Sequence, residues 1–226
     1  GDNAWVNMIV HRSGEVGETI SFKVFDSSTG LTHEKTKASA VITSSDAEAV
    51  DVGNFENPFM IEMKDFEIQT LSLKEGWNLV SFYVEADDMS PQAVLAPIQN
   101  QLLEIRGVNA SYNPRVDPLF NQSLPTLNVK EGYWVEVNED VSFEVEGRVS
   151  SGVSTNLNGG WNLVGYPRMN GEAVASELAS LGSTVVQMKT LEDSYDPSNP
   201  PFLNTLSTMA PGSGYWLNVT QDGMWV

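Results

Sequence analysis

The sequence predicts a strand-dominated α+β fold, with a β-sandwich-like module at the amino end and two homologous small α+β modules after it. The chain has 226 residues, of which 41% are hydrophobic, and this length accommodates two to three small domains with real cores. A set of aromatic landmarks occurs twice in the later part of the chain and is absent before it. The predicted modules are therefore residues 1–68, 69–149 and 150–226.

The two later modules are predicted from an internal repeat with a separation of about 83 residues. Three landmarks keep the same order in both copies: Gly76-Trp77-Asn78-Leu79-Val80 and Gly160-Trp161-Asn162-Leu163-Val164, Tyr112-Asn113-Pro114 and Tyr195-Asp196-Pro197, and Gly132-Tyr133-Trp134 and Gly214-Tyr215-Trp216. Agreement at so many ordered positions indicates duplication of one folding unit.

Each copy reads as a β-α-β-β unit. The Trp-Asn-Leu-Val run is short, apolar and preceded by glycine, which is typical of a buried strand. Ser90-Pro91 then predicts a helix start, and apolar residues follow at helical spacing as far as Leu102. Strands are expected at 103–112 and 184–188, at the Tyr-Trp segments, and at 141–145, where apolar residues alternate.

The amino-terminal module is predicted to be all-β. Residues 20–26 alternate as a half-buried strand, 27–30 form a turn, and 40–43 form another strand. Residues 71–75 are expected to join this module to the first repeat, and residues 150–158 to link the two repeats.

The Gly-Trp-Asn-Leu-Val, Tyr-x-Pro and Gly-Tyr-Trp pattern resembles tandem modules of large surface or secreted proteins of marine bacteria. Similar stretches occur in structural proteins of marine phages, and the 22–59 region is similar to a β-module that accompanies them. The resemblance implies an extracellular, cell-surface or virus-particle setting and brings no catalytic residues with it. The amino-terminal module is shorter than the usual form, so its completeness is left open.

Charge and cysteine content exclude several partners. Thirty acidic residues against 12 basic ones give a formal charge of −18, which disfavours nucleic acid and anionic membranes as partners. The chain has no cysteine, so disulfides and thiolate metal sites are excluded. His11 and His33 are interpreted as surface or hydrogen-bonded residues.

The sequence favours a protein that is not an enzyme. Nucleotide-binding, metalloprotease and serine-hydrolase signatures are missing, and neither repeat contains a histidine. Paired carboxylates could perform glycosidase chemistry, but among 30 acids such pairs arise by accident.

Binding to a glycan is the sharper hypothesis, because tryptophan and tyrosine faces stack on sugar rings. The four paired tryptophans are interpreted as core residues, since both copies have them: Trp77, Trp134, Trp161 and Trp216. The candidate ligand-binding residues are instead unpaired tryptophans and polar residues of two long loops: Trp5, Trp225, Asn113, Asn121, Asp196 and Asn199. Phe120 and Phe202 lie in the same two loops and are interpreted either as exposed loop tips or as residues that plug the core.

Calcium is the cofactor that the acidic clusters would suit, because hard cations prefer carboxylate oxygens. The candidate ligands are Asp87, Asp88 and Asp193. A solvated acidic surface explains the same residues, and the pair before Ser90 also suits a helix start.

We therefore expect a non-catalytic structural or adhesive segment that presents loops to a glycan, a surface protein or other copies of itself. A carbohydrate-binding module of a polysaccharide-degrading enzyme and a phage virion structural or decoration protein are the alternatives.

Overall fold

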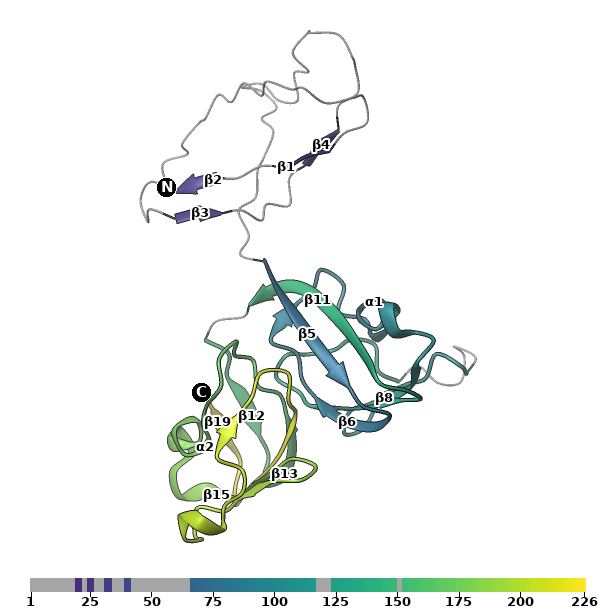
Figure 1. Cartoon of the computed structure of the whole chain (residues 1–226). Helices are drawn as coiled ribbons and strands as arrows, with labels where there is room; N and C mark the ends of the chain where they lie inside the picture. The colour runs from purple at the N-terminus through teal and green to yellow at the C-terminus, as the bar shows by residue number, and fades with distance from the viewer. Residues whose placement is uncertain are drawn as a thin grey trace, which may run out of the picture. The chain divides into compact units, whose positions relative to one another are not determined.

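The computed structural model describes the backbone of four short strands between residues 19 and 41, and then residues 66–116, 123–149 and 152–226. The chain divides into two units, Gly1–Asp65 and Phe66–Val226 (Figure 1).

The described part of the first unit consists of two antiparallel strand pairs. The strands are β1 (Thr19–Ser21), β2 (Val24–Asp26), β3 (Leu31–His33) and β4 (Ser39–Val41). β1 pairs with β4, and β2 pairs with β3. The predicted single strand over 20–26 is thus two strands. The sandwich-like arrangement stays a prediction, because the remainder of this unit lies outside the described residues.

The second unit contains both repeats. The elements of repeat 1 are β5 (Phe66–Leu73), β6 (Gly76–Val80), β7 (Val84–Glu85), α1 (Pro91–Val94), the 3-10 helix η1 (Ala96–Ile98), β8 (Leu102–Arg106), β9 (Ser111–Tyr112), β10 (Tyr133–Val137) and β11 (Val141–Val149). Those of repeat 2 are β12 (Thr155–Leu157), β13 (Gly160–Val164), β14 (Glu172–Ala173), α2 (Val174–Glu177), η2 (Ala179–Thr184), β15 (Val185–Lys189), β16 (Ser194–Tyr195), η3 (Pro201–Leu203), β17 (Thr208–Met209), β18 (Tyr215–Val219) and β19 (Gly223–Trp225).

Each repeat is built on a four-stranded antiparallel sheet, and the two sheets have the same strand order. This order is β6-β10-β8-β9 in repeat 1 and β13-β18-β15-β16 in repeat 2. Outside these sheets, β5 pairs with β11 and β12 pairs with β19. The predicted strand-dominated α+β class is confirmed. The predicted join at 71–75 is wrong, because residues 71–73 lie inside the eight-residue strand β5.

The helices are shorter than the apolar spacing predicts. The Ser90 hydroxyl caps α1 by accepting a hydrogen bond from the Ala93 N–H. Pro97 lies one turn later, where its ring clashes with the carbonyl of residue 93 in an α-helix, so the chain continues as η1. Leu102 therefore begins β8 and is not the last helical residue.

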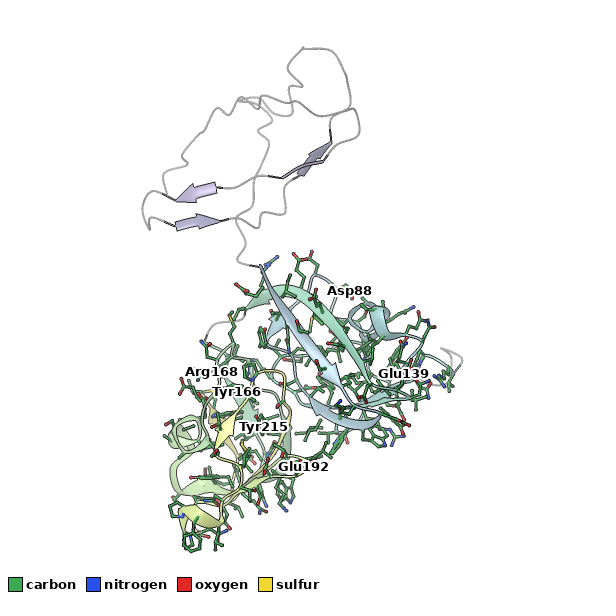
Figure 2. The ribbon with its side chains drawn as sticks, viewed as in Figure 1. Asp88, Glu139, Tyr166, Arg168, Glu192 and Tyr215 are labelled. Atoms are coloured by element: carbon green, nitrogen blue, oxygen red, sulfur yellow. The ribbon has the colours of Figure 1, made fainter. Side chains whose placement is uncertain are left out.

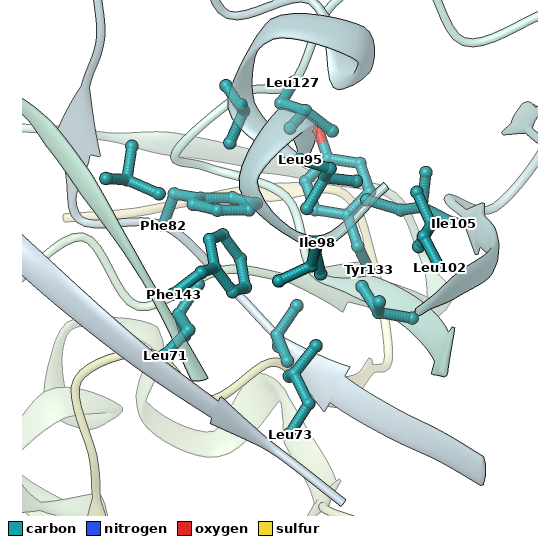
Figure 3. Packing of buried hydrophobic residues seen from close by; sticks show 14 of the residues in the cluster. Leu71, Leu73, Phe82, Leu95, Ile98, Leu102, Ile105, Leu127, Tyr133 and Phe143 are labelled. Atoms are coloured by element: carbon teal, nitrogen blue, oxygen red, sulfur yellow. The ribbon is translucent and has the colours of Figure 1, made fainter. Parts of the chain in front are cut away.

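The two repeats have separate hydrophobic cores. In repeat 1 the short helices pack over the inner face of the sheet, and β5 and β11 close the core (Figure 3). Phe82 and Tyr133 meet at its centre with ring centroids 6.3 Å apart. In repeat 2 the equivalent residues are Tyr166 and Tyr215, both fully buried.

Within the Gly-Trp-Asn-Leu-Val motif, the first glycine and the asparagine make the turn that starts the strand. Gly76 and Gly160 have φ angles of 91° and 97°, which favour glycine. The Asn78 side chain accepts a hydrogen bond from the Lys74 N–H at 2.9 Å and donates to the Lys74 carbonyl at 2.7 Å. Asn162 makes the equivalent two bonds with the backbone of Asn158, at the same distances.

The two repeats are joined by reciprocal backbone hydrogen bonds. The Gly214 N–H donates to the Leu79 carbonyl at 3.2 Å, and the Gly132 N–H donates to the Leu163 carbonyl at 3.3 Å. The residues just before each Tyr-Trp strand thus pair with the Trp-Asn-Leu-Val strand of the other repeat. The contact has the pattern of a local two-fold axis, in which equivalent residues exchange equivalent bonds.

Buried serine and glycine residues make this close approach feasible. The Ser81 hydroxyl donates to the Ser213 carbonyl at 2.7 Å and accepts from the Tyr166 N–H at 3.1 Å. A Cβ atom at Gly214 would lie 2.6 Å from the Val80 carbonyl oxygen. Small residues at the junction therefore let the backbones of the repeats meet.

Candidate functional site: two exposed tryptophan faces

The most unusual surface of the second unit carries the four paired tryptophans. Trp77 is 38% exposed and Trp161 is 45% exposed, while Trp134 and Trp216 are partly exposed. The interpretation of these residues as core was wrong. In each repeat the core is filled by the other face of the same strands, through Tyr, Val and Leu side chains.

Strand register puts each tryptophan pair on one outer sheet face, because residues directly opposite each other in a sheet share a face. In repeat 1 the two adjacent rows are Trp77, Glu136 and Glu104, and then Leu79, Trp134 and Arg106. In repeat 2 the equivalent rows are Trp161, Asn218 and Gln187, and then Leu163, Trp216 and Lys189. We call these the first and the second tryptophan face.

The tryptophans of each face contact one another edge to face. The ring centroids of Trp77 and Trp134 lie 6.4 Å apart at an interplanar angle of 81°, and those of Trp161 and Trp216 lie 6.5 Å apart at 84°. Such a pair contributes roughly 0.5–1.5 kcal/mol beyond the burial of its area. The geometry is nearly identical in the two repeats, so both faces hold their aromatic rings in a defined arrangement.

A basic side chain lies against each pair. The Arg106 guanidinium carbon is 5.4 Å from the centroid of Trp77, and the Lys189 Nζ is 5.2 Å from that of Trp161. Both distances are within the range of a cation–π contact. Each face therefore combines aromatic area with one positive charge.

The two faces lie on the same side of the paired sheets. Leu79 is opposite Gly214 in the pairing between the repeats, and Gly214 shares its side of the strand with Trp216. By the same reasoning, Leu163 lies over Gly132, with its Cδ1 atom 3.0 Å from where a Cβ would stand. Leu79 and Leu163 are buried yet belong to neither repeat's core cluster. They fill the strip between the two faces.

The predicted ligand residue Trp225 is placed differently. It is 5% exposed, packs in the core of repeat 2, and donates its indole hydrogen to the Glu177 carbonyl at 2.8 Å. It therefore does not present a ring face to solvent as a stacking platform would. It holds β19 against β12 at the edge of the repeat.

Trp225 also lines a small polar pocket. The buried Glu177 carboxylate forms a salt bridge with Arg168, with 3.1 Å between Arg168 Nε and Glu177 Oε2. The Tyr166 phenol lines the same pocket, and Figure 2 labels Arg168 and Tyr166. Burial, followed by the charge of Glu177, raises the pKa of Tyr166 to about 12, so this phenol is protonated at neutral pH. The cavity holds about 20 Å³, which is room for one water molecule.

The predicted loop residues shape their own loops. The Asn113 side chain accepts a hydrogen bond from the Arg115 N–H at 2.9 Å. The Asp196 carboxylate accepts from the Ser198 N–H at 2.8 Å and from its hydroxyl at 2.6 Å, and these bonds lower the pKa of Asp196. The Asn199 N–H donates to the Asp196 carbonyl at 3.1 Å. The bonds from the Arg115 and Ser198 N–H groups to Asn113 and Asp196 are turn-forming bonds of the Asx type, and the Asn199 bond closes a backbone turn.

The remaining predicted site residues lie either in an exposed loop or outside the residues that the structure describes. Phe202 is 84% exposed, so it is not a core plug. Trp5, Asn121 and Phe120 lie outside the described residues. The structure brings none of the described candidates, Trp225, Asn113, Asp196 and Asn199, onto the tryptophan faces.

The acidic candidates for calcium are dispersed. Asp88 accepts a hydrogen bond from the Ser90 N–H at 2.8 Å, and this contact lowers the pKa of Asp88. Asp87 lies 3.9 Å from the Arg148 guanidinium, and Asp193 lies in the other repeat, beside Glu192 (Figure 2). Across the described ranges, no three acidic or histidine residues are gathered as a metal site would require.

The sequence contained a signal for the tryptophan faces. In Tyr133–Val137, the residues Tyr133, Val135 and Val137 alternate with Trp134 and Glu136. A strand that buries its valines therefore places Trp134 on the same side as a carboxylate. Equal residues in two copies, in contrast, do not distinguish a duplicated core from a duplicated surface.

Comparisons with known proteins give no relative: no family model, no curated protein and no solved structure matches this chain. A search of the helices in the described part of the chain finds none with the length and apolar character needed to span a bilayer.

Proposed function

We propose that this chain is a non-catalytic binding segment of an extracellular or particle-surface protein, and that its two tryptophan faces bind a glycan. The observation that carries the proposal is the exposure of Trp77 and Trp161 at equivalent positions, each beside a second tryptophan. Water-exposed indole area of this kind has a free-energy cost that a stacked sugar ring would remove.

Polar groups around the rings suit the same ligand. Each face has side chains that can hydrogen-bond sugar hydroxyls on the strands next to the tryptophans: Glu136 and Glu104 on the first face, and Asn218 and Gln187 on the second. An open sheet face accommodates an extended chain, whereas the pocket beside Glu177 has room for only one water molecule.

The duplication supports a polymeric ligand. Two weak sites on one side of two hydrogen-bonded repeats act together, because binding at one raises the effective concentration at the other. An active site gains little from such copying. This reasoning favours binding over catalysis for the chain.

A glycan and polysaccharide array probed with the intact chain tests the proposal. Trp77→Ala and Trp161→Ala should each weaken binding, and the double variant should abolish it. Phe202→Ala is the matched control, because Phe202 is an exposed aromatic residue away from both faces. Binding that survives the double tryptophan variant, or that Phe202→Ala removes, would contradict the proposal.

A further inference from the structure

The two tryptophan faces carry opposite charges, although their aromatic residues match. Equivalent positions on the two faces hold different residues: Glu104 corresponds to Gln187, Glu136 to Asn218, and Arg106 to Lys189. The first face therefore has two carboxylates and one guanidinium, and the second has two amides and one ammonium. Their formal charges are −1 and +1.

On the first face the positive charge is neutralised. Glu104 Oε2 accepts from Arg106 Nη2 at 2.6 Å. The hydrogen bond that Arg106 donates to Glu104, then the charge of Glu104 and to a smaller extent that of Glu136, raise the pKa of the Arg106 guanidinium. Arg106 thus already has its anionic partners within the protein.

On the second face the positive charge has no such partner. Lys189 has no carboxylate oxygen within 4 Å in the part of the chain that the structure describes. Asp222, the residue before β19, accepts a hydrogen bond from the Gly159 N–H at 2.8 Å. Lys189 stays next to the exposed ring of Trp161, where a sugar would stack.

We propose that the second tryptophan face binds an acidic saccharide, a uronate or sulfated sugar, while the first face binds a neutral one. This inference rests on the proposed glycan-binding function. Stacking on Trp161 would orient the ring, and Lys189 would receive the carboxylate or sulfate as a point charge with three donors. The amide groups of Gln187 and Asn218 can donate hydrogen bonds to the same anion, which the carboxylates of the first face cannot do.

The chain's overall charge of −18 does not prevent this selectivity. At physiological ionic strength the Debye length is about 8 Å, so distant carboxylates are screened while Lys189 acts at contact distance. The same screening predicts that binding of the acidic sugar weakens as salt is added.

The test uses matched pairs of probes that differ only in their anionic groups: β-1,4-mannuronate hexamer against β-1,4-mannohexaose, and dextran sulfate against dextran. Calorimetric titration of the intact chain should show tighter binding of an acidic member. Lys189→Met should weaken this binding about tenfold, the size expected for loss of one charge-assisted hydrogen bond. Lys189→Arg should retain most of it, and Arg148→Met should leave it unchanged, because Arg148 is a cation on β11, outside both faces.

A reciprocal variant tests the charge argument on the first face. Replacing Glu104 by Gln and Glu136 by Asn should give that face affinity for the same acidic probe. The mannuronate pair and the dextran pair distinguish a uronate ligand from a sulfated one, and either result supports the inference.

Two results would overturn the inference. Neutral probes that bind Trp77→Ala, a variant without a working first face, as well as their acidic partners do would show that the second face does not select charge. Acidic binding that Lys189→Met leaves intact would show the same. In both cases glycan binding itself stands. The absence of binding to every array glycan and to all four probes would reject the proposed function together with the inference.

Discussion

Alanine at Gly214 should separate the two repeats, because the added methyl group has no room in the junction. The Cβ atom would lie 2.6 Å from the Val80 carbonyl oxygen, and ordinary contact needs about 3.4 Å. The strands would have to move apart by about 0.8 Å. The 3.2 Å hydrogen bond from the Gly214 N–H to the Leu79 carbonyl would then stretch to about 4.0 Å and be lost.

The size of the effect follows from three terms. Overlap against a backbone atom costs about 1–3 kcal/mol, since no rotamer change relieves it. The stretched hydrogen bond adds about 1 kcal/mol. Alanine returns about 0.4–1 kcal/mol by restricting the unfolded chain. The free energy of unfolding should therefore fall by about 1–3.5 kcal/mol, which for a chain of this size lowers Tm by about 2–14 °C.

Scanning calorimetry of the intact chain measures this change. Gly132→Ala, whose Cβ would lie 2.8 Å from the Val164 carbonyl oxygen, should behave like Gly214→Ala. Gly223→Ala is the control, because nothing lies within 4 Å of its Cβ position. If the Tm values of both junction variants stayed within about 1 °C of the control, the reciprocal backbone pairing described above would be wrong.

Three further predictions concern buried hydrogen bonds and titration. Ser81→Ala should cost about 1–3 kcal/mol in urea unfolding, since it leaves the Ser213 carbonyl and Tyr166 N–H without their partner, whereas exposed Ser72→Ala should cost less than about 0.5 kcal/mol. The Lys74 ammonium and the Glu75 N–H lower the pKa of Asp140, so its contribution to stability is present above about pH 4 and is lost as the pH falls through the folded value. The difference in Tm between wild type and Asp140→Asn should accordingly disappear near pH 2. Burial raises the pKa of Tyr166 to about 12, so its contribution to stability is lost as the pH rises from about 10 towards that value. Alkaline titration followed by phenolate absorbance checks this. The absorbance that wild type shows in excess of Tyr166→Phe belongs to Tyr166, and it should appear only at a pH above that of an ordinary tyrosine.

The sequence was sufficient for the elements with strong local signals. The Gly-Trp-Asn-Leu-Val strands, the Ser90 helix start and the alternating strand from Val141 all occur in the structure. The predicted helix end is wrong, because Leu102 continues the apolar spacing beyond Pro97 although the proline ends the α-helix.

The candidate site was harder to predict because it depends on pairing between distant strands. Arg106 and Lys189 stand next to the tryptophans only after β8 and β15 pair with the Gly-Tyr-Trp strands. Their positions in the sequence do not predict the contact of Arg106 with Trp77 or of Lys189 with Trp161. The side of the sheet on which each tryptophan lies is likewise fixed by the register, and a shift of one residue would have buried it.

Identity between the two copies and difference between them carry separate information. The residues that are the same in both, such as Asn78 and Asn162, build turns, junctions and aromatic pairs that either copy needs in order to fold and dock. If the two faces bind sugars as proposed, a preference of one face for a particular sugar must come from the positions at which the two copies differ. Around the tryptophans three positions differ: two of them exchange a carboxylate for an amide, and the third exchanges Arg106 for Lys189. Lys189 has no carboxylate oxygen within 4 Å among the residues that the structure describes. The chemistry that distinguishes the repeats should therefore be sought at Gln187, Asn218 and Lys189, and not at the tryptophans that they share.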